Sequence, residues 1–181
     1  MSSANVSTGN VVTISGGGEA PAVPANVELE QALLGAILVN NAAYARVAGF
    51  LKPEHFSETI HRAVYEAAGN LIRADKIANP TTLKTYLGDQ DLGGVTLNRY
   101  LVRMSIEATT IVNCVDYAEG IRDLAMRREM MQICDRVRRA CMDMPMEMSP
   151  ATLAAETAQE LTEAIGGGPR DTRRDVDASA A

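Results

Sequence analysis

The stretch VELEQALLGAILVNN, Val27 to Asn41, decides the fold of this chain. Its apolar residues recur at helical spacing in two adjacent stripes: Leu29, Leu33, Ala36 and Ile37, then Leu34 and Leu38. A helix that is apolar around most of its circumference has to be covered from several sides. The stretch therefore predicts the central helix of an all-α domain.

Polar residues mark the beginning of this helix. Asn26 can accept a backbone N–H as the N-cap, and Glu28 and Glu30 lie in the first turn, where the helix dipole favours negative charge. Gly35, in the middle of the helix, costs roughly 1 kcal/mol relative to alanine. That cost is tolerable if a second helix crosses close to the backbone at Gly35.

Composition limits the class of protein. The 181 residues suffice for one domain, or one domain with an appendage. A net charge of −6 argues against a dedicated nucleic-acid binder, whose surface is basic. No apolar run approaches the ~20 residues that span a bilayer. The three cysteines, Cys114, Cys134 and Cys141, have no paired spacing and indicate reduced thiols buried in the core of a cytoplasmic protein.

Four segments are expected along the chain. Residues 1–25 and 166–181 are polar and rich in Gly, Ser or Asp, which predicts disordered tails. Residues 26–112 predict a small bundle of five short helices, over about 27–41, 42–51, 59–73, 81–87 and 96–107. In the fourth of these we expect Thr81 to cap the helix and Tyr86 to face inward with Leu83 and Leu87.

Residues 113–165 predict an antiparallel helical hairpin. A long amphipathic helix runs from Asn113 until Pro145 stops it. Ser149 followed by Pro150 then starts a second helix, which continues to Ile165. A hairpin of this length cannot bury both of its faces against itself, so its spare apolar surface needs the bundle or another chain.

A series of sequence blocks carries a resemblance to a known family. The blocks are NVELEQALLGAILVNN (26–41), LKPEHF (51–56), HRAVY (61–65), TLKTYL (82–87), EATTIVN (107–113) and LAMRR (124–128). In this order and spacing, the region from Pro24 to Ile165 resembles the N-terminal domain of bacterial DnaB-type replicative helicases. The resemblance implies a helical bundle followed by a hairpin that pairs subunits, in a collar on a hexameric ring where primase docks and on which loaders act.

The ATP-dependent motor of that family lies in a separate C-terminal domain. This chain contains no G-x-x-x-x-G-K-[ST] sequence, the loop that would cradle the phosphates of ATP. We therefore expect no catalytic residues and no cofactor. The resemblance implies an oligomerising, primase-docking module whose partners are primase, full-length helicase or a loader. We expect it to bind neither DNA nor a membrane. The alternative is a free-standing regulator that binds helicase or primase and interferes with ring assembly.

Two sets of residues are candidates for interaction surfaces. Those expected to form a self-association interface on the hairpin are Ile133, Cys134, Val137, Cys141, Leu153 and Leu161. Those expected to form a soft partner patch at the hairpin tip, or to pack the turn itself, are Met142, Met144, Met146 and Met148. The two histidines, His55 and His61, lack converging ligands for a metal and are interpreted as packing and capping residues around Pro53.

Overall fold

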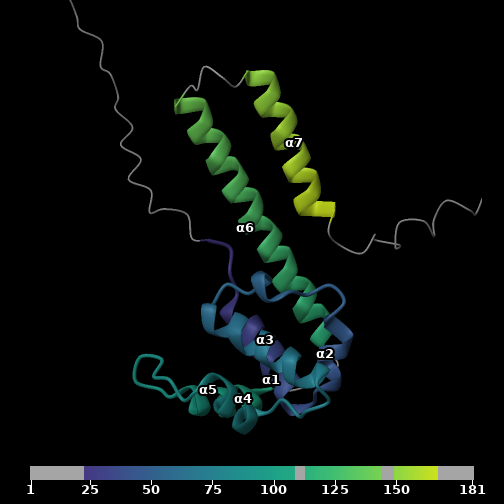
Figure 1. Ribbon diagram of the computed structural model, residues 1–181, viewed down its shortest axis with the longest axis vertical. Coiled ribbons are helices and arrows are strands. Elements are labelled where there is room, and N and C mark those ends of the chain that lie inside the picture. Colours follow the sequence, from purple (N-terminus) through teal and green to yellow (C-terminus); the bar gives the residue numbers. More distant parts are fainter. Residues whose placement is uncertain (1–22, 109–112, 144–148, 167–181) are drawn as a thin grey trace, which may run out of the picture.

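The computed structural model describes residues 23–108, 113–143 and 149–166, and these are organised in helices. The elements are α1 (Val27–Val39), α2 (Ala42–Val47), the 3-10 turn η1 (Pro53–His55), α3 (Thr59–Arg73), α4 (Pro80–Leu87), α5 (Leu97–Glu107), α6 (Cys114–Asp143) and α7 (Pro150–Gly166). Figure 1 shows α1 to α5 gathered at one end of the molecule, with α6 rising out of them and α7 beside it. The all-α prediction, a bundle followed by a hairpin, is confirmed.

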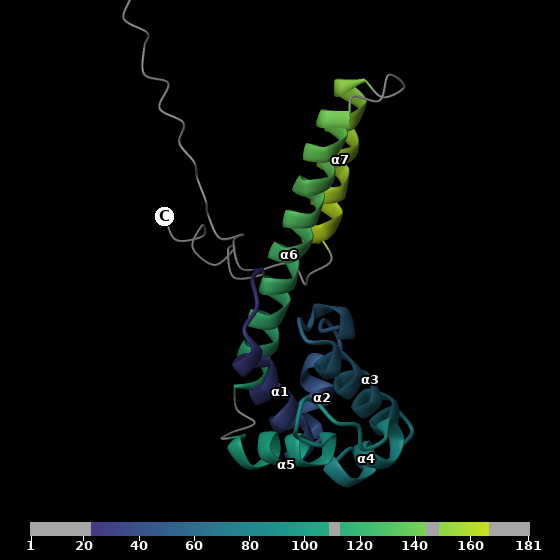
Figure 2. The ribbon, with the colours of Figure 1, turned by 90° about the vertical axis from the view of Figure 1, so that its left-hand side faces the viewer.

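Helix α1 is the central element of the bundle, as its apolar circumference predicts. It packs against α2, α3, α5 and α6, and Leu33 and Ile37 are fully buried. Figure 2 shows α1 alongside the base of α6, with α5 crossing beneath it. Asn26 caps the helix, since its side-chain oxygen accepts the backbone N–H of Leu29 at 2.9 Å.

The condition that makes Gly35 tolerable, a second helix crossing close to its backbone, is met. A β-carbon added at Gly35 would overlap the backbone carbonyl oxygen of Met104 in α5. The missing side chain therefore allows two helix backbones to touch, and this contact offsets the low helix propensity of glycine.

Two details of α4 differ from the sequence-based expectation. Asn79, not Thr81, is the N-cap, and its side chain accepts the backbone N–H of Thr82 at 2.9 Å. The physical reason is Pro80, which is favoured at the first helical position and so places the cap one residue before it. Tyr86 was expected to face inward but is 59% exposed, because α4 contributes one buried side chain, Leu83, to the bundle.

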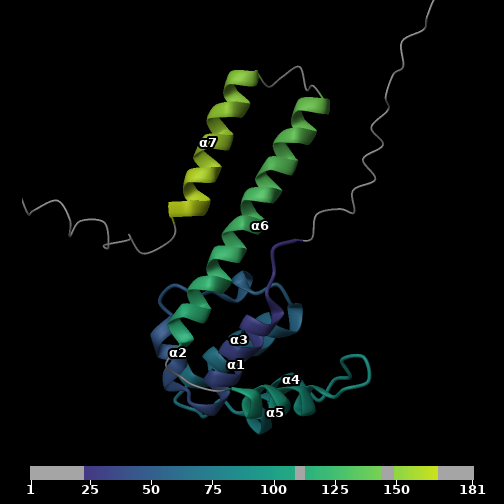
Figure 3. The same cartoon turned by 180° about the vertical axis from the view of Figure 1, so that it is seen from behind.

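The hairpin is anchored in the bundle at one end only. Near the beginning of α6, Cys114, Ala118 and Ile121 are buried, whereas further along the helix Ile133 is the one buried side chain among the described residues. Figure 3 shows α7 running back beside the outer part of α6. Ser149 caps α7 as predicted, accepting the Thr152 backbone N–H at 3.1 Å.

The prediction that all three thiols belong to the core is wrong for two of them. Cys114 is buried in the hydrophobic core, but Cys134 and Cys141 are exposed on α6. Two paired helices cover one face of each other, and these two cysteines lie outside the covered face.

Candidate functional site

A chain of buried polar groups joins three helices of the bundle. Glu30 of α1 accepts from Nδ1 of His61 in α3 at 2.6 Å, and Nε2 of His61 lies 2.7 Å from the hydroxyl of Tyr100 in α5. Gln31 donates its amide to the same hydroxyl at 2.8 Å. The other Glu30 oxygen accepts both the backbone N–H and the hydroxyl of Ser57, at 2.6 and 2.7 Å.

The donors of this network have one consistent assignment with a neutral imidazole. The ionised Glu30 carboxylate can only accept, so the one N–H of a neutral His61 lies on Nδ1 and donates to it. Nε2 of His61 then accepts from the Tyr100 hydroxyl, which in turn accepts from the amide of Gln31. Burial raises the pKa of Glu30, but the hydrogen bonds from His61 and Ser57 together outweigh it and hold the pKa below its ordinary value. Burial raises the pKa of Tyr100, which therefore keeps its proton at neutral pH.

The order carboxylate, imidazole, hydroxyl is one that enzymes use, but its setting here is structural. His61 has no exposed surface and Glu30 is 2% exposed, so no substrate can reach the imidazole. The prediction that His61 is a packing residue is confirmed. Its partner was missed, although the sequence carried a signal: Glu30 lies three residues before Leu33 and seven before Ile37, on the apolar stripe of α1.

An arginine fastens the hairpin to the bundle. Arg128 of α6 donates one guanidinium N–H to the backbone oxygen of Pro24 at 2.8 Å and another to that of His55 at 2.5 Å. Pro24 leads into α1 and His55 ends η1, so this one side chain sets where α6 leaves the bundle. Outside the bundle, α6 packs against α7.

The predicted self-association residues all lie on the hairpin, but they do not share one face. Ile133 is 2% exposed within the single chain, and Val137, Leu153 and Leu161 are partly buried where α6 and α7 pack together. Cys134 and Cys141 remain exposed. Together with Met130 and Val137 they recur at spacings of 4, 3 and 4 residues, which is one helix face. We call Met130, Cys134, Val137 and Cys141 the outer stripe.

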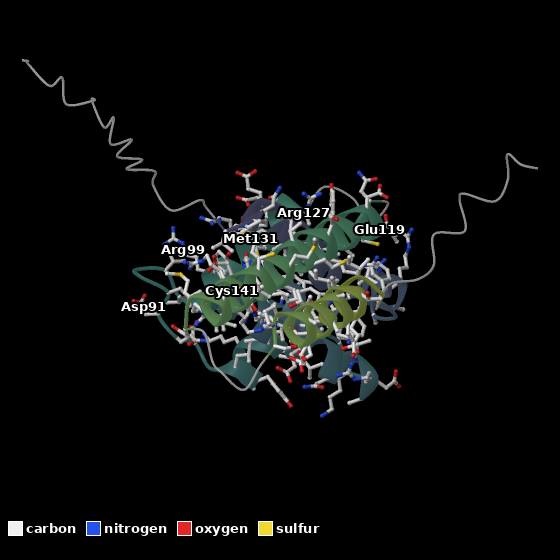
Figure 4. The ribbon with its side chains drawn as sticks, turned by 90° about the horizontal axis from the view of Figure 1, so that it is seen from above. Asp91, Arg99, Glu119, Arg127, Met131 and Cys141 are labelled. Atoms are coloured by element: carbon white, nitrogen blue, oxygen red, sulfur yellow. The ribbon has the colours of Figure 1, made fainter. Side chains whose placement is uncertain are left out.

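The predicted methionine patch is described at one position only. Met142 is 71% exposed near the end of α6, while Met144, Met146 and Met148 lie outside the described residues. The structure adds two exposed methionines that the sequence did not single out, Met130 and Met131. Figure 4 shows Met131 on the side of α6 away from α7.

Metal and membrane sites receive no support from the described residues. Within 23–108, 113–143 and 149–166, no three His, Cys, Asp or Glu side chains are grouped to hold a metal ion. His55 instead accepts the backbone N–H of Lys52 at its Nδ1, 3.2 Å away, as the capping interpretation expects. No helix in the same ranges combines the length and apolarity needed to cross a membrane.

The fold and its surfaces define a helical bundle with a projecting antiparallel hairpin. Residues 22–123 match the DnaB-like helicase N terminal domain family, over more than half of the chain. The chain belongs to this family. The match extends from the lead into α1 to the first part of α6, and it includes Glu30, His61 and Tyr100.

Curated relatives resemble the chain over the same region. It is 37% identical over 119 residues to the replicative DNA helicase DnaB of Rickettsia typhi, a match that covers 64% of this chain and 23% of that protein. It is 29% identical over 122 residues to the DnaB of Pasteurella multocida, covering 65% of this chain and 26% of that protein. The chain thus spans about a quarter of the length of these relatives.

Solved structures share the fold. The N-terminal domain of DnaB helicase from Mycobacterium tuberculosis superposes with a TM-score of 0.70 at 23% identity, covering 78% of this chain and 99% of that one. A DnaB-like replicative helicase, described together with its interactions with primase, superposes with a TM-score of 0.61 at 22% identity, covering 75% of this chain and 31% of that one.

Proposed function

We propose that this chain is a non-enzymatic assembly and docking module of the replicative-helicase type. The observation that carries the proposal is the outer stripe, a face of α6 on which Met130, Cys134 and Cys141 are exposed and Val137 is partly buried. Family membership supports it, since matched relatives are replicative helicases of which only the N-terminal part corresponds to this chain.

The hairpin is proposed to self-associate, as a dimer or a higher oligomer. Met130 is 39% exposed beside the exposed Cys134 and Cys141, so much of the outer stripe faces water. Two such stripes related by a twofold axis would cover each other, because an isologous interface uses the same patch twice. The spacing of 4, 3 and 4 residues suits helix-to-helix packing.

The docking partner is proposed to be a protein of the replication machinery, with primase first. The DnaB-like helicase that shares this fold is described with primase interactions. Charge favours a protein partner over DNA: residues 26–112 carry nine acidic and eight basic side chains, and residues 113–148 carry seven and six. Neither half has the basic excess that displaces counterions from a phosphate backbone. A full-length helicase or a loader remains the alternative partner, and binding to helicase without primase would indicate a regulator of ring assembly.

Self-association is tested by sedimentation of the full chain at tens of micromolar. Cys134→Glu places a charge in the outer stripe and should turn a dimer into a monomer, since a buried unpaired charge is costly. Gln132→Glu adds the same charge at an exposed position of α6 outside the stripe and should leave the dimer intact. A monomeric parent chain, or equal behaviour of the two variants, would exclude this interface.

Docking and the absence of a motor are tested separately. A pull-down with primase and with full-length helicase as baits, beside a single-stranded DNA shift at low salt, separates the partners. We expect micromolar affinity for one protein contact, about −8 kcal/mol. A ligand that binds the native state raises the melting temperature. We expect ATP not to bind, so millimolar ATP should leave the melting temperature of the chain unchanged.

A further inference from the structure

Two adjoining pockets lie where η1 meets α6. Their volumes are about 210 and 460 Å³, and both are lined by Lys52, His55, Ala125 and Glu129. The smaller one extends to Phe50 and to the end of α7, and the larger one extends along α3. We call the two together the η1 trough.

Four cationic side chains line the η1 trough: Lys52, Arg62, Arg122 and Arg128. None of them forms an ion pair with any carboxylate in the described part of the chain, whereas Arg103, Arg127, Arg136 and Arg138 all do. Cations that line a concave surface and outnumber the carboxylates there, without forming ion pairs, are suited to an anionic ligand.

Arg122 has a buried N–H donor without a hydrogen-bond acceptor in the described part of the chain. Its Nη1 atom is buried and donates to no acceptor among the described residues, while its guanidinium lies over the Phe50 ring at 5.7 Å from the centroid. An unsatisfied buried donor is costly, more so when it is charged. Arg122 also lines the smaller pocket, so an anionic acceptor placed there would lie beside its guanidinium.

Two other cations are held in place by backbone oxygens. Arg62 donates through Nε to the carbonyl of Phe56 at 2.7 Å, and Arg128 donates to the carbonyl of His55. Each guanidinium carries five N–H groups, so donors remain on both. Burial, and to a lesser extent the charge of Lys52, lower the pKa of His55, so its imidazole is neutral at pH 7. Because Nδ1 accepts the backbone N–H of Lys52, the ring proton lies on Nε2, which can donate to a ligand.

The acidic residues of the η1 trough limit the negative charge that a ligand can carry. Glu54, Glu129 and Glu163 also line it, so four cations face three carboxylates. Glu163 is already engaged, since it accepts the side-chain amide of Gln159 at 2.9 Å. A net excess of one positive charge suits a single oxyanion but is too small to neutralise the many phosphates of a polyanion such as DNA.

We propose that the η1 trough binds a single oxyanion, a carboxylate or a phosphate group, with Arg122 as its principal ligand. Lys52 and the Nε2–H of His55 complete the donors, and the ligand satisfies the buried guanidinium nitrogen. The bound oxyanion bridges η1 and α6, so it stiffens the joint that Arg128 also holds.

The test is a titration of the full chain followed by ¹H–¹⁵N correlation spectra. Sodium phosphate and sodium acetate are added in separate arms, with sodium chloride keeping the ionic strength constant. We expect saturable shifts confined to the amides of Lys52, Glu54 and His55 and to residues 122–129 of α6, with a dissociation constant on the order of millimolar. A response to phosphate alone identifies a phosphoryl ligand, and a response to acetate identifies a carboxylate.

Matched variants decide the assignment. Arg122→Gln should weaken binding about tenfold, the loss typical of a charged hydrogen bond. Arg127→Gln removes the same charge from an exposed position of α6 that pairs with Asp123 and should bind like the parent. If Arg122→Gln does not fold, the exposed Lys52→Gln should still weaken binding several-fold. Shifts that never saturate, or equal affinity in the Arg122 or Lys52 variant and the parent, would overturn the proposal.

Discussion

The Nδ1 atom of His61 lies 2.6 Å from a carboxylate oxygen of Glu30, although 31 residues separate them in the sequence. Both side chains are inside the bundle, so the pair is shielded from water. It ties α3 to α1, and the second ring nitrogen of His61 continues to Tyr100 and so to α5. A protein interior usually excludes such groups, and here every member has a partner.

Removing His61 should be among the most damaging substitutions in the bundle. His61→Ala leaves the Glu30 carboxylate buried without its ring partner and opens a cavity, which should cost about 3–5 kcal/mol of unfolding free energy. Tyr100→Phe removes one hydroxyl from the far end of the network and should cost only about 1 kcal/mol. Urea unfolding followed by circular dichroism measures both. Similar losses in the two variants would mean that the pair with Glu30 contributes little.

The same pair predicts how stability depends on pH. The folded-state pKa of Glu30 lies below its unfolded value of about 4.5, so the unfolded chain takes up a proton first as the pH falls. The stabilisation is therefore complete above pH 4.5 and is lost progressively between that value and the lower folded pKa. Urea midpoints measured from pH 7 to pH 3 should fall less steeply in Glu30→Gln than in the parent, below pH 4.5.

An exposed carboxylate provides the comparison. The backbone N–H of Asn98 and the ammonium of Lys84 also lower the pKa of Asp89, which lies at the surface. Asp89→Asn should change the fall of the urea midpoint below pH 4.5 less than Glu30→Gln does, because solvent screens the exposed group. The reverse order would show that the Glu30 network does not govern acid unfolding.

The crossing of α1 and α5 gives a steric prediction. Gly35→Ala should destabilise the fold by about 1–3 kcal/mol, because the new methyl group meets the Met104 carbonyl and forces the helices apart. Gly49→Ala is the matched control, since a β-carbon there has nothing within 4 Å and should be neutral or slightly stabilising. Thermal unfolding of the two variants, in parallel with the parent, checks the difference. Equal melting temperatures would contradict the close crossing.

Local signals in the sequence predicted the helices and several of their contacts. The Asn26 cap follows from residues next to each other along one helix. The cost of Gly35 in a helix indicated where a second helix would pass close, but not that this helix would be α5. The pairing of Glu30 with His61 did not follow, since the place of Glu30 on the apolar stripe of α1 indicates burial but not its partner, and only the fold brings the two residues together. The prediction for Cys134 was wrong for a related reason: its spacing fits a buried face, but no element in the described part of the chain covers it.

Two adjacent arginines in the LAMRR block should behave differently, although the sequence does not distinguish them. Arg128 donates to two backbone oxygens that join α6 to Pro24 and His55, whereas Arg127 is exposed and pairs with Asp123 one turn away. Arg128→Ala leaves both carbonyls without this donor and should cost about 1–3 kcal/mol, whereas Arg127→Ala should cost less than about 0.5 kcal/mol.

Hydrogen exchange can show where the Arg128 substitution acts. The backbone N–H of Phe56 is bonded to the carbonyl of Pro53 at 3.2 Å, inside the turn that Arg128 holds against α6. In Arg128→Ala this amide should exchange faster by a larger factor than the amide of Ala68 in the buried part of α3, because the joint opens without global unfolding. Uniformly faster exchange in both places would instead show that Arg128 stabilises the whole bundle and does not act at the joint.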